Sequence, residues 1–479
     1  MQKTPSSFYV LITVFFFWGF VAASNDILIP VFKEKLNLEQ WQSQMISFAF
    51  YVAYTIGSII YYLLSKSFGG DILNKIGYKN GIALGLVISA VGTLLFYPAA
   101  QLVSFPLMIS GLFIVGLGFS LQQTAANPLA ITMGDSSKGS QRLSMAGGIN
   151  NFGTTIGPLL ISFAIFGSAT ATSSEASIES IKTPYLILGL AFLIVAFLFK
   201  TSSIPNKIEQ GSSQETSVNA ISNDRKSALK YPQLILGMIA IFVYVGVEVS
   251  TASNLPEFMK KHLNTPTDKI APFVSLFWAS LMIGRWTSSV GAFKISMGAK
   301  KIFQFLMPYI AFAVFLFVNK IANHDITPFY VYCFVIFVLV IGDILSKGNP
   351  ARQLLIYSTL AIVALFIGML ADGMTSVYAF ISVGLFCSTL WPCIFTLAIT
   401  GLGKHTNEGS SFLIMMIMGG GFISLLQGIL ASDAILGIQW SYLVGVACFA
   451  YLVFYALKAK QLLLKQGVNF DETTTTGSH

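Results

Sequence analysis

Two carboxylates inside long apolar runs of this sequence, where acidic side chains are rare, are the first functional candidates. Asp26 lies midway along the run from Thr13 to Phe32, and Glu248 lies in a run over 232–258. A carboxylate in a hydrocarbon layer is costly, so it normally faces a helix bundle or a water-filled cavity and marks the path of an ion or substrate. Both acids are candidates for proton coupling. A structural bond to a neighbouring helix is the alternative for Asp26.

Helical spacing groups further polar side chains with each acid. Trp18, Asn25 and Asp26 fall on one helical face, and an aromatic plate beside hydrogen-bonding groups suits a sugar. Tyr244 and Glu248 share a second face. Glu248 could bind a sugar hydroxyl, carry the proton, or pair with Arg285, a cation inside another helix. The spacing leaves these three roles open.

Amides and aromatic residues supply other candidate ligands. Gln123 and Asn127 lie one turn apart and could bind sugar hydroxyls, or form interhelical hydrogen bonds of about 0.6 kcal/mol each. Trp391, on a face shared with Gly384, Ser388 and Phe395, is the candidate for stacking on the sugar. Gln427, aligned with Gly420 and Ser424, is a further candidate ligand.

The composition is that of a polytopic helical membrane protein. Hydrophobic residues make up 54% of the 479 residues and charged residues only 10%. The net charge of +8 comes from bases scattered over short loops, which argues against a nucleic-acid partner. The four cysteines and four histidines form no metal-binding or catalytic pattern, so we expect no enzyme, metal or cofactor.

The apolar runs divide the chain into two halves. Each run is long enough to cross a bilayer, or nearly so. Six precede a polar segment over 201–230 with the composition of a linker, and eight follow it. The runs cover 8–32, 44–64, 79–99, 103–129, 141–167, 183–199, 232–258, 270–293, 301–319, 328–345, 353–371, 374–401, 409–432 and 438–458. We therefore predict an N-terminal bundle over 1–200, a linker over 201–230, a C-terminal bundle over 231–460 and a tail over 461–479.

Lysine and arginine residues in short loops predict the orientation. Their bias places both termini and the linker in the cytoplasm. Related sequences end the first helix of each half, with Pro30 and Phe32 matching Pro256 and Phe258, although two helix ends can resemble each other by chance. Two repeated bundles around a central site are typical of transporters that work by alternating access.

Several segments resemble the fucose/galactose/glucose:proton symporter family of the major facilitator superfamily. They are WGFVAASNDILIPVFK, GLGFSLQQTAANP, RLSMAGGINNFGTTIGP, FVYVGVEVS, ASLMIGRW, GLFCSTLWPCIFTLAITGLGKHT and GGGFISLLQG. The resemblance implies two six-helix bundles and sugar uptake driven by a cation gradient. It leaves two apolar runs at about 301–345 as inserted helices, for a total of about 14. We expect these to be structural and lipid-facing, with regulation or partner docking as the alternative.

The resemblance also implies roles for individual residues. Fucose transporters carry an acid at the position of Gln123, whereas glucose and galactose members resemble this chain in having Gln there. Asn150 matches a sugar-facing Asn of the family. Arg285 is similar to a gate or helix-locking residue of the family. The loop GGDILNKIGYKNG resembles a cytoplasmic loop motif in which Lys75, Gly77 and Lys79 would form a gate contact. The chain departs from the family pattern at positions that include Gly147, Gly148 and Cys387.

These features predict a monomeric symporter in the cell inner membrane that takes up glucose or galactose with a proton. Sodium coupling is an alternative because carboxylate oxygens also bind cations. The features are also compatible with fucose or an amino sugar as the substrate, with a sensor that binds sugar without transporting it, and with a passive facilitator.

Overall fold

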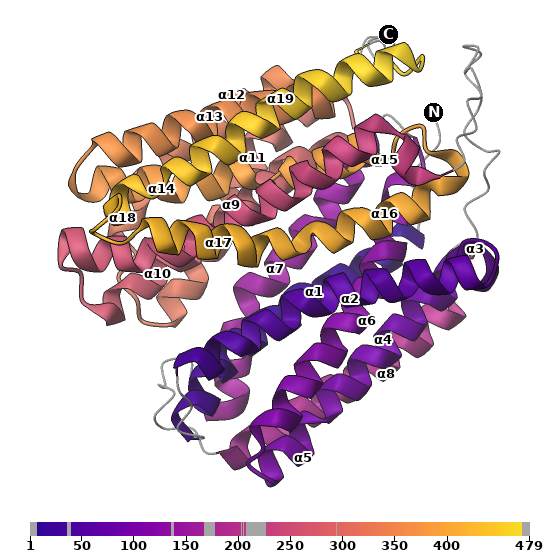
Figure 1. Cartoon of the computed structure of the whole chain (residues 1–479). Coiled ribbons are helices and arrows are strands. Elements are labelled where there is room, and N and C mark those ends of the chain that lie inside the picture. Colours follow the sequence, from indigo (N-terminus) through magenta and orange to yellow (C-terminus); the bar gives the residue numbers. More distant parts are fainter. Residues whose placement is uncertain are drawn as a thin grey trace.

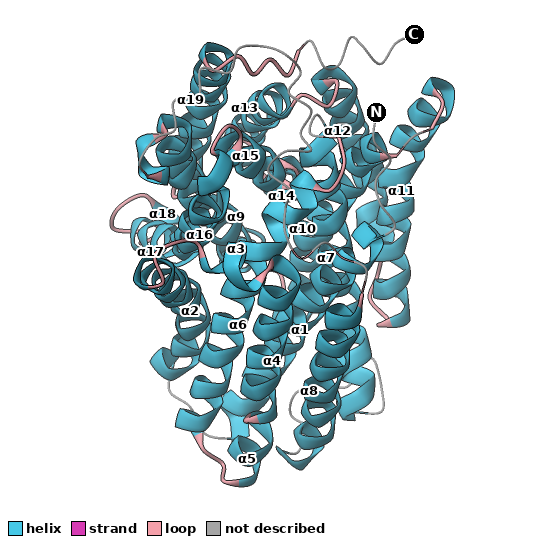
Figure 2. Ribbon diagram, turned by 90° about the vertical axis from the view of Figure 1, so that its right-hand side faces the viewer, coloured by secondary structure: helices cyan, strands magenta, loops and turns pink. Residues whose placement is uncertain are grey.

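The protein was analysed as a computed structural model that describes residues 7–35, 40–135, 138–166, 178–202, 204, 206, 227–293 and 295–471. Within these ranges, the side chains of 22–35, 40–48, 158–159, 161–166, 178–181, 267–268 and 297 are not part of the description. Most of the predicted linker therefore lies outside the described residues. All regular elements in the described ranges are helices (Figure 2).

The first half of the chain forms one helical bundle. Its long helices follow the predicted apolar runs, with a short helix at a turn near each end of α4. They are α1 (Ser7–Lys35), α2 (Gln40–Ser67), α3 (Ile72–Ile76), α4 (Tyr78–Leu94), α5 (Phe96–Gln101), α6 (Phe105–Thr132), α7 (Gly139–Phe166) and α8 (Ile178–Thr201). Helix α1 packs on α7, and α4 packs on α6 and α8. Glycines allow α4 and α6 to approach closely, because a Cβ on Gly92 would lie 2.6 Å from Gly111 O.

The second half forms the other bundle around α9. Its elements are α9 (Pro232–Leu263), α10 (Thr267–Ser289), α11 (Met297–Ile321), α12 (Tyr332–Ser346), α13 (Pro350–Leu370), α14 (Gly373–Cys387), α15 (Leu390–Ile399), α16 (Thr406–Met415), α17 (Gly419–Leu430), α18 (Gly437–Trp440) and α19 (Leu443–Lys465). Helices α14 and α15 follow one line and break before Pro392, which cannot donate the backbone bond that would continue the helix.

The described residues contain ten helical segments that are long and apolar enough to cross a membrane. The structure and composition are those of a multi-pass membrane protein. Helices α11 and α12 are among these segments and lie on the outside of the second bundle, against α10, α13 and α14. Their outer side chains are strongly exposed, for example Phe317 at 66% and Phe334 at 77%, as expected of surfaces that face lipid.

The two bundles meet at one end and diverge toward the other (Figure 1). The start of α1 and the end of α19 lie at the end where the bundles meet. Hydrogen bonds join the bundles there: Ser410 Oγ donates to Thr124 O over 2.9 Å, and Ser411 Oγ donates to Ser58 O over 3.2 Å. We call this the closed end of the molecule.

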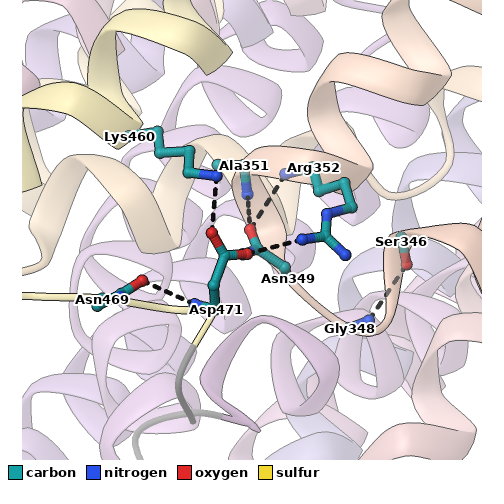
Figure 3. A network of polar contacts seen from close by, with 8 residues as sticks. All are labelled: Ser346, Gly348, Asn349, Ala351, Arg352, Lys460, Asn469 and Asp471. Atoms are coloured by element: carbon teal, nitrogen blue, oxygen red, sulfur yellow. Dashed lines mark hydrogen bonds and ion pairs between the residues drawn. The ribbon is translucent and has the colours of Figure 1, made fainter. Parts of the chain in front are cut away.

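The segment after α19 folds back onto the closed end (Figure 3). The Asp471 carboxylate accepts hydrogen bonds from Arg352 Nη2 and Asn349 Nδ2, each over 2.8 Å, and forms an ion pair with Lys460 over 2.7 Å. Asn349 also caps the first turn of α13 by accepting from the backbone of Ala351. The tail is therefore tied to α13 and α19 as far as Asp471.

Candidate functional site

A cavity of about 390 Å³ lies between the two bundles. Helices α1, α2, α6 and α7 supply one wall, and α9, α10 and α15 supply the other. Its lining includes eight of the candidate residues that sequence analysis selected: Trp18, Gln123, Asn127, Asn150, Tyr244, Glu248, Arg285 and Trp391. Tertiary packing therefore gathers side chains from six helices around one space of a size that suits a small polar molecule.

Glu248 is the acid with a described side chain in this cavity. Tyr244 lies one turn earlier on α9, and its hydroxyl donates a hydrogen bond to the Glu248 carboxylate. Trp391 lies beside this pair, with its ring centroid 6.3 Å from that of Tyr244. An acid, a phenol and an indole on one wall can bond the hydroxyls of a sugar and cover its apolar face.

Arg285 enters the cavity from α10 and bonds neutral oxygens. Its Nε donates to Ser388 O over 2.8 Å, and its Nη1 donates to Asn151 Oδ1 over 2.6 Å. In the described part of the chain, no ion pair within 4 Å joins Arg285 to Glu248. Arg285 thus connects the two bundles, while Glu248 stays with Tyr244.

The amides of the first bundle differ in how much of their hydrogen-bonding capacity is in use. Asn127 is 2% exposed, and its Nδ2 has no hydrogen-bond partner in the structure. Gln123 Nε2 donates to Tyr54 Oη over 3.0 Å, and Asn150 Nδ2 donates to Phe15 O over 3.0 Å. Asn127 Nδ2 is therefore a buried donor without a protein partner beside the cavity.

Several lining residues escaped sequence analysis. Phe50, Tyr51 and Tyr54 of α2 and Trp278 of α10 add aromatic surface. Trp278 precedes Arg285 by seven residues, a helical spacing that places both on one face and could have revealed it. The α2 aromatics gave no such signal, because aromatic residues occur throughout these helices.

The other predicted site residues lie elsewhere. Gln427 is buried away from the cavity lining, and its Nε2 donates to Ser441 Oγ over 3.4 Å. The backbone of Asn25 and Asp26 belongs to α1, but their side chains lie outside the described residues. Their proposed roles stay predictions.

The loop between α2 and α4 lies at the closed end. Lys79 Nζ donates to Ser202 O over 3.2 Å, and Lys75 Nζ donates to Phe68 O, so both lysines bond within the first half. Gly77 has a φ of 90°, and a Cβ there would lie 2.0 Å from Asn206 Oδ1.

The contact of this loop with the second bundle is made at Asn407. Its carboxamide accepts a hydrogen bond from the Tyr78 hydroxyl and donates one to Asn74 Oδ1 over 3.2 Å. Both partners lie next to residues that sequence analysis selected, and Asn74 stands where the family motif usually has an Asp.

Comparison with known proteins agrees with this architecture. Residues 10–339 match the Major Facilitator Superfamily. The chain is 33% identical over 454 residues to a glucose/galactose transporter of Brucella abortus, covering 93% of this chain and 92% of that protein. It is 26% identical to the L-fucose-proton symporter of Escherichia coli, covering 94% and 92%.

A solved structure has the same fold. The crystal structure of the transporter FucP in the outward conformation superposes with a TM-score of 0.72 at 26% identity, covering 95% of this chain and 99% of that one. The fold, the central cavity and these relatives together place the chain in the fucose/galactose/glucose:proton symporter family of the major facilitator superfamily.

Proposed function

We propose that this protein imports a hexose of the glucose or galactose type together with a proton, by alternating access. The observation that carries the proposal is the cavity between the bundles, where Glu248, the free Asn127 amide and Trp391 face one space. The names of the relatives support a sugar as substrate and a proton as the coupled ion. Gln123 favours a hexose over fucose, because fucose transporters have an acid at that position.

We propose the following roles for individual residues. Trp391 would stack on the apolar face of the sugar, and Asn127, Gln123 and Glu248 would bond its hydroxyls. Asn150, Asn25 and Gln427 are proposed as further ligands, although Asn150 and Gln427 bond other protein groups in this structure. Glu248 accepts from Tyr244, which suits a ligand role for both residues.

Asp26 is proposed as the main coupling acid. A carboxylate at mid-membrane can bind a proton from one side, lose its charge and then move through an apolar interior at lower cost. Glu248 is the alternative coupling acid, and sodium is the alternative coupling ion. In the absence of a coupled ion the protein would act as a facilitator.

The proposed setting is the cell inner membrane. Fourteen crossings, counting α11 and α12 as an insertion into the twelve-helix family plan, would place both termini and the linker in the cytoplasm. The working units would be the two bundles over 1–200 and 231–460, joined by the linker over 201–230, with the tail over 461–479. We propose that the monomer is the functional form.

Purified protein in liposomes provides the test. Counterflow of labelled sugars, measured against a panel of glucose, galactose, fucose and glucosamine, should show exchange of glucose or galactose. Uptake should also alkalinise a lightly buffered external medium without sodium. Strict dependence on sodium with no pH change would overturn proton coupling, and binding without counterflow would identify a sensor.

A further inference from the structure

Helices α7 and α10 make an extensive contact between the bundles beside the cavity. Two consecutive glycines of α7, Gly147 and Gly148, face two consecutive side chains of α10, Arg285 and Trp286. Trp286 Nε1 donates to Gly148 O over 3.1 Å, and Arg285 Nη1 donates to Gly147 O over 3.3 Å. Side chains of one bundle therefore reach the main chain of the other.

This contact is possible because Gly147 and Gly148 of α7 have no side chains. A Cβ on Gly147 would lie 3.0 Å from Arg285 Nη1, and a Cβ on Gly148 would lie 2.7 Å from Trp286 Cδ1. Neither glycine has a φ in the left-handed region, so close approach explains them and backbone freedom does not. Gly147 also lines the cavity.

The charges around the cavity are not paired in this arrangement. All three acceptors of Arg285, which are Ser388 O, Gly147 O and Asn151 Oδ1, are neutral. Glu248 lines the same cavity as Arg285 and accepts a hydrogen bond from Tyr244. If Arg285 turned toward Glu248, it would lose its bonds to Gly147 and Asn151.

We call the pair of glycines that accepts Arg285 and Trp286 the Gly147–Gly148 seat. We propose that this seat makes Arg285 a positioning residue, which links the occupancy of the cavity to the contact between the bundles. The proposal rests on the transport function proposed above. In a water-filled cavity, solvent weakens the attraction between Glu248 and Arg285, and Arg285 keeps its hydrogen bonds to α7. A bound sugar expels water and strengthens that attraction. Arg285 then turns to Glu248, and the α7–α10 contact opens.

The distance between the bundles at the closed end reports on this contact. Spin labels at Lys66→Cys and Lys301→Cys, both exposed and on different bundles, measure it in a background carrying Cys333→Ser. Gly147→Ala tests the seat, and Arg285→Lys keeps the charge but loses the planar fork of donors. Gly421→Ala is the matched control, because a Cβ there meets no atom within 4 Å.

Without sugar, Gly147→Ala and Arg285→Lys should each raise the ratio of open to closed molecules at least about threefold, since each removes bonds made only in the closed arrangement. Gly421→Ala should match the unmodified protein. With glucose or galactose, Glu248→Gln should fail to open even when sugar is bound. Unchanged distances in Gly147→Ala and Arg285→Lys, or full sugar-induced opening in Glu248→Gln, would refute the proposal.

The sugar-free comparison separates this proposal from the proposed function. It needs no transported substrate, so its result stands even if no sugar in the panel is exchanged. Conversely, normal sugar counterflow with unchanged distances in Gly147→Ala and Arg285→Lys would refute the seat and leave sugar transport intact.

Discussion

At the scale of residues, the two walls of the cavity have different chemistry. Among the lining residues that the structure describes, the second bundle contributes an acid and a guanidinium through Glu248 and Arg285, while the first contributes amides such as Asn127. A ligand must touch both walls to satisfy Asn127 and Glu248 together. Such a division lets one small molecule influence how the bundles sit against each other.

The two acids should respond differently to removal of their charge. Glu248→Gln should lower sugar affinity about tenfold or more, because hydrogen bonds to a charged group contribute about 1.5–3 kcal/mol. The sugar that still enters should carry its proton. Asp26→Asn should abolish accumulation against a gradient and leave counterflow, because exchange requires no net proton movement.

Sugar-induced alkalinisation and counterflow, measured in parallel for both variants, provide the check. Proton movement that is lost in Glu248→Gln but kept in Asp26→Asn would reverse the two assignments.

Asp471 should make stability depend on pH. The hydrogen bond from Lys460, with the nearby charges of Lys460 and Arg352, holds the pKa of the Asp471 carboxyl below its ordinary value. Because the pKa is lower in the folded state, its contribution is present above the unfolded value of about 4 and is lost as pH falls through the folded value.

The melting temperature in detergent should therefore be lower for Asp471→Asn than for the unmodified protein at pH 7. The difference should shrink steadily as the pH is lowered below about 4. An equal difference at all pH values would show that the charge of Asp471 is not what stabilises the tail.

At the scale of elements, α12 is attached to the second bundle through a buried acid. Asp343 is 5% exposed and accepts from Gln304 Nε2 of α11 over 2.8 Å and from Gln353 Nε2 of α13 over 3.2 Å. Cys393 of α15 donates to Gln353 Oε1 over 3.6 Å. Asp343 thus joins the two helices of this apolar hairpin to each other and to α13.

Asp343→Leu should destabilise the protein by about 1–3 kcal/mol, because it leaves the amides of Gln304 and Gln353 without an acceptor. Combining it with Gln304→Leu should cost less than the sum of the two single changes, since the orphaned amide is removed. Chemical or thermal unfolding in detergent measures both effects. Strict additivity would mean that the two side chains do not interact.

At the scale of the whole molecule, the start of α1, the end of α19 and hydrogen bonds between the bundles all lie at the closed end (Figure 1). The relative FucP is described in an outward conformation and has the same fold. If both termini are cytoplasmic, the closed end is the cytoplasmic end and the cavity opens outward.

Labelling of single cysteines tests this orientation. His324→Cys, in the loop between α11 and α12, should react with an impermeant maleimide in intact cells. Lys66→Cys, at the closed end of α2, should react only after permeabilisation, because solvent reaches it from the cytoplasm. Reaction of the 320–327 loop only after permeabilisation would contradict the fourteen-crossing arrangement.

The sequence alone determined what depends on composition and local geometry. Hydropathy identified the membrane helices, because crossing a bilayer requires a long apolar run. Helical spacing put Tyr244 and Glu248 on one face, since residues four apart are neighbours within any helix. Helical spacing also selected Gln123 and Asn127, and the charge of Arg285 inside an apolar run selected that residue; all three line the cavity.

Only the tertiary structure decided which helices meet. Arg285 bonds Asn151, which is 134 residues away, and Trp18 of α1 donates to Gln122 of α6. Gln427 has the same spacing pattern as the lining residues but bonds within its own bundle. Apolar helices offer many different faces to one another, so spacing along one helix cannot specify its partner. Shape and hydrogen bonding between helices distant in sequence make that choice.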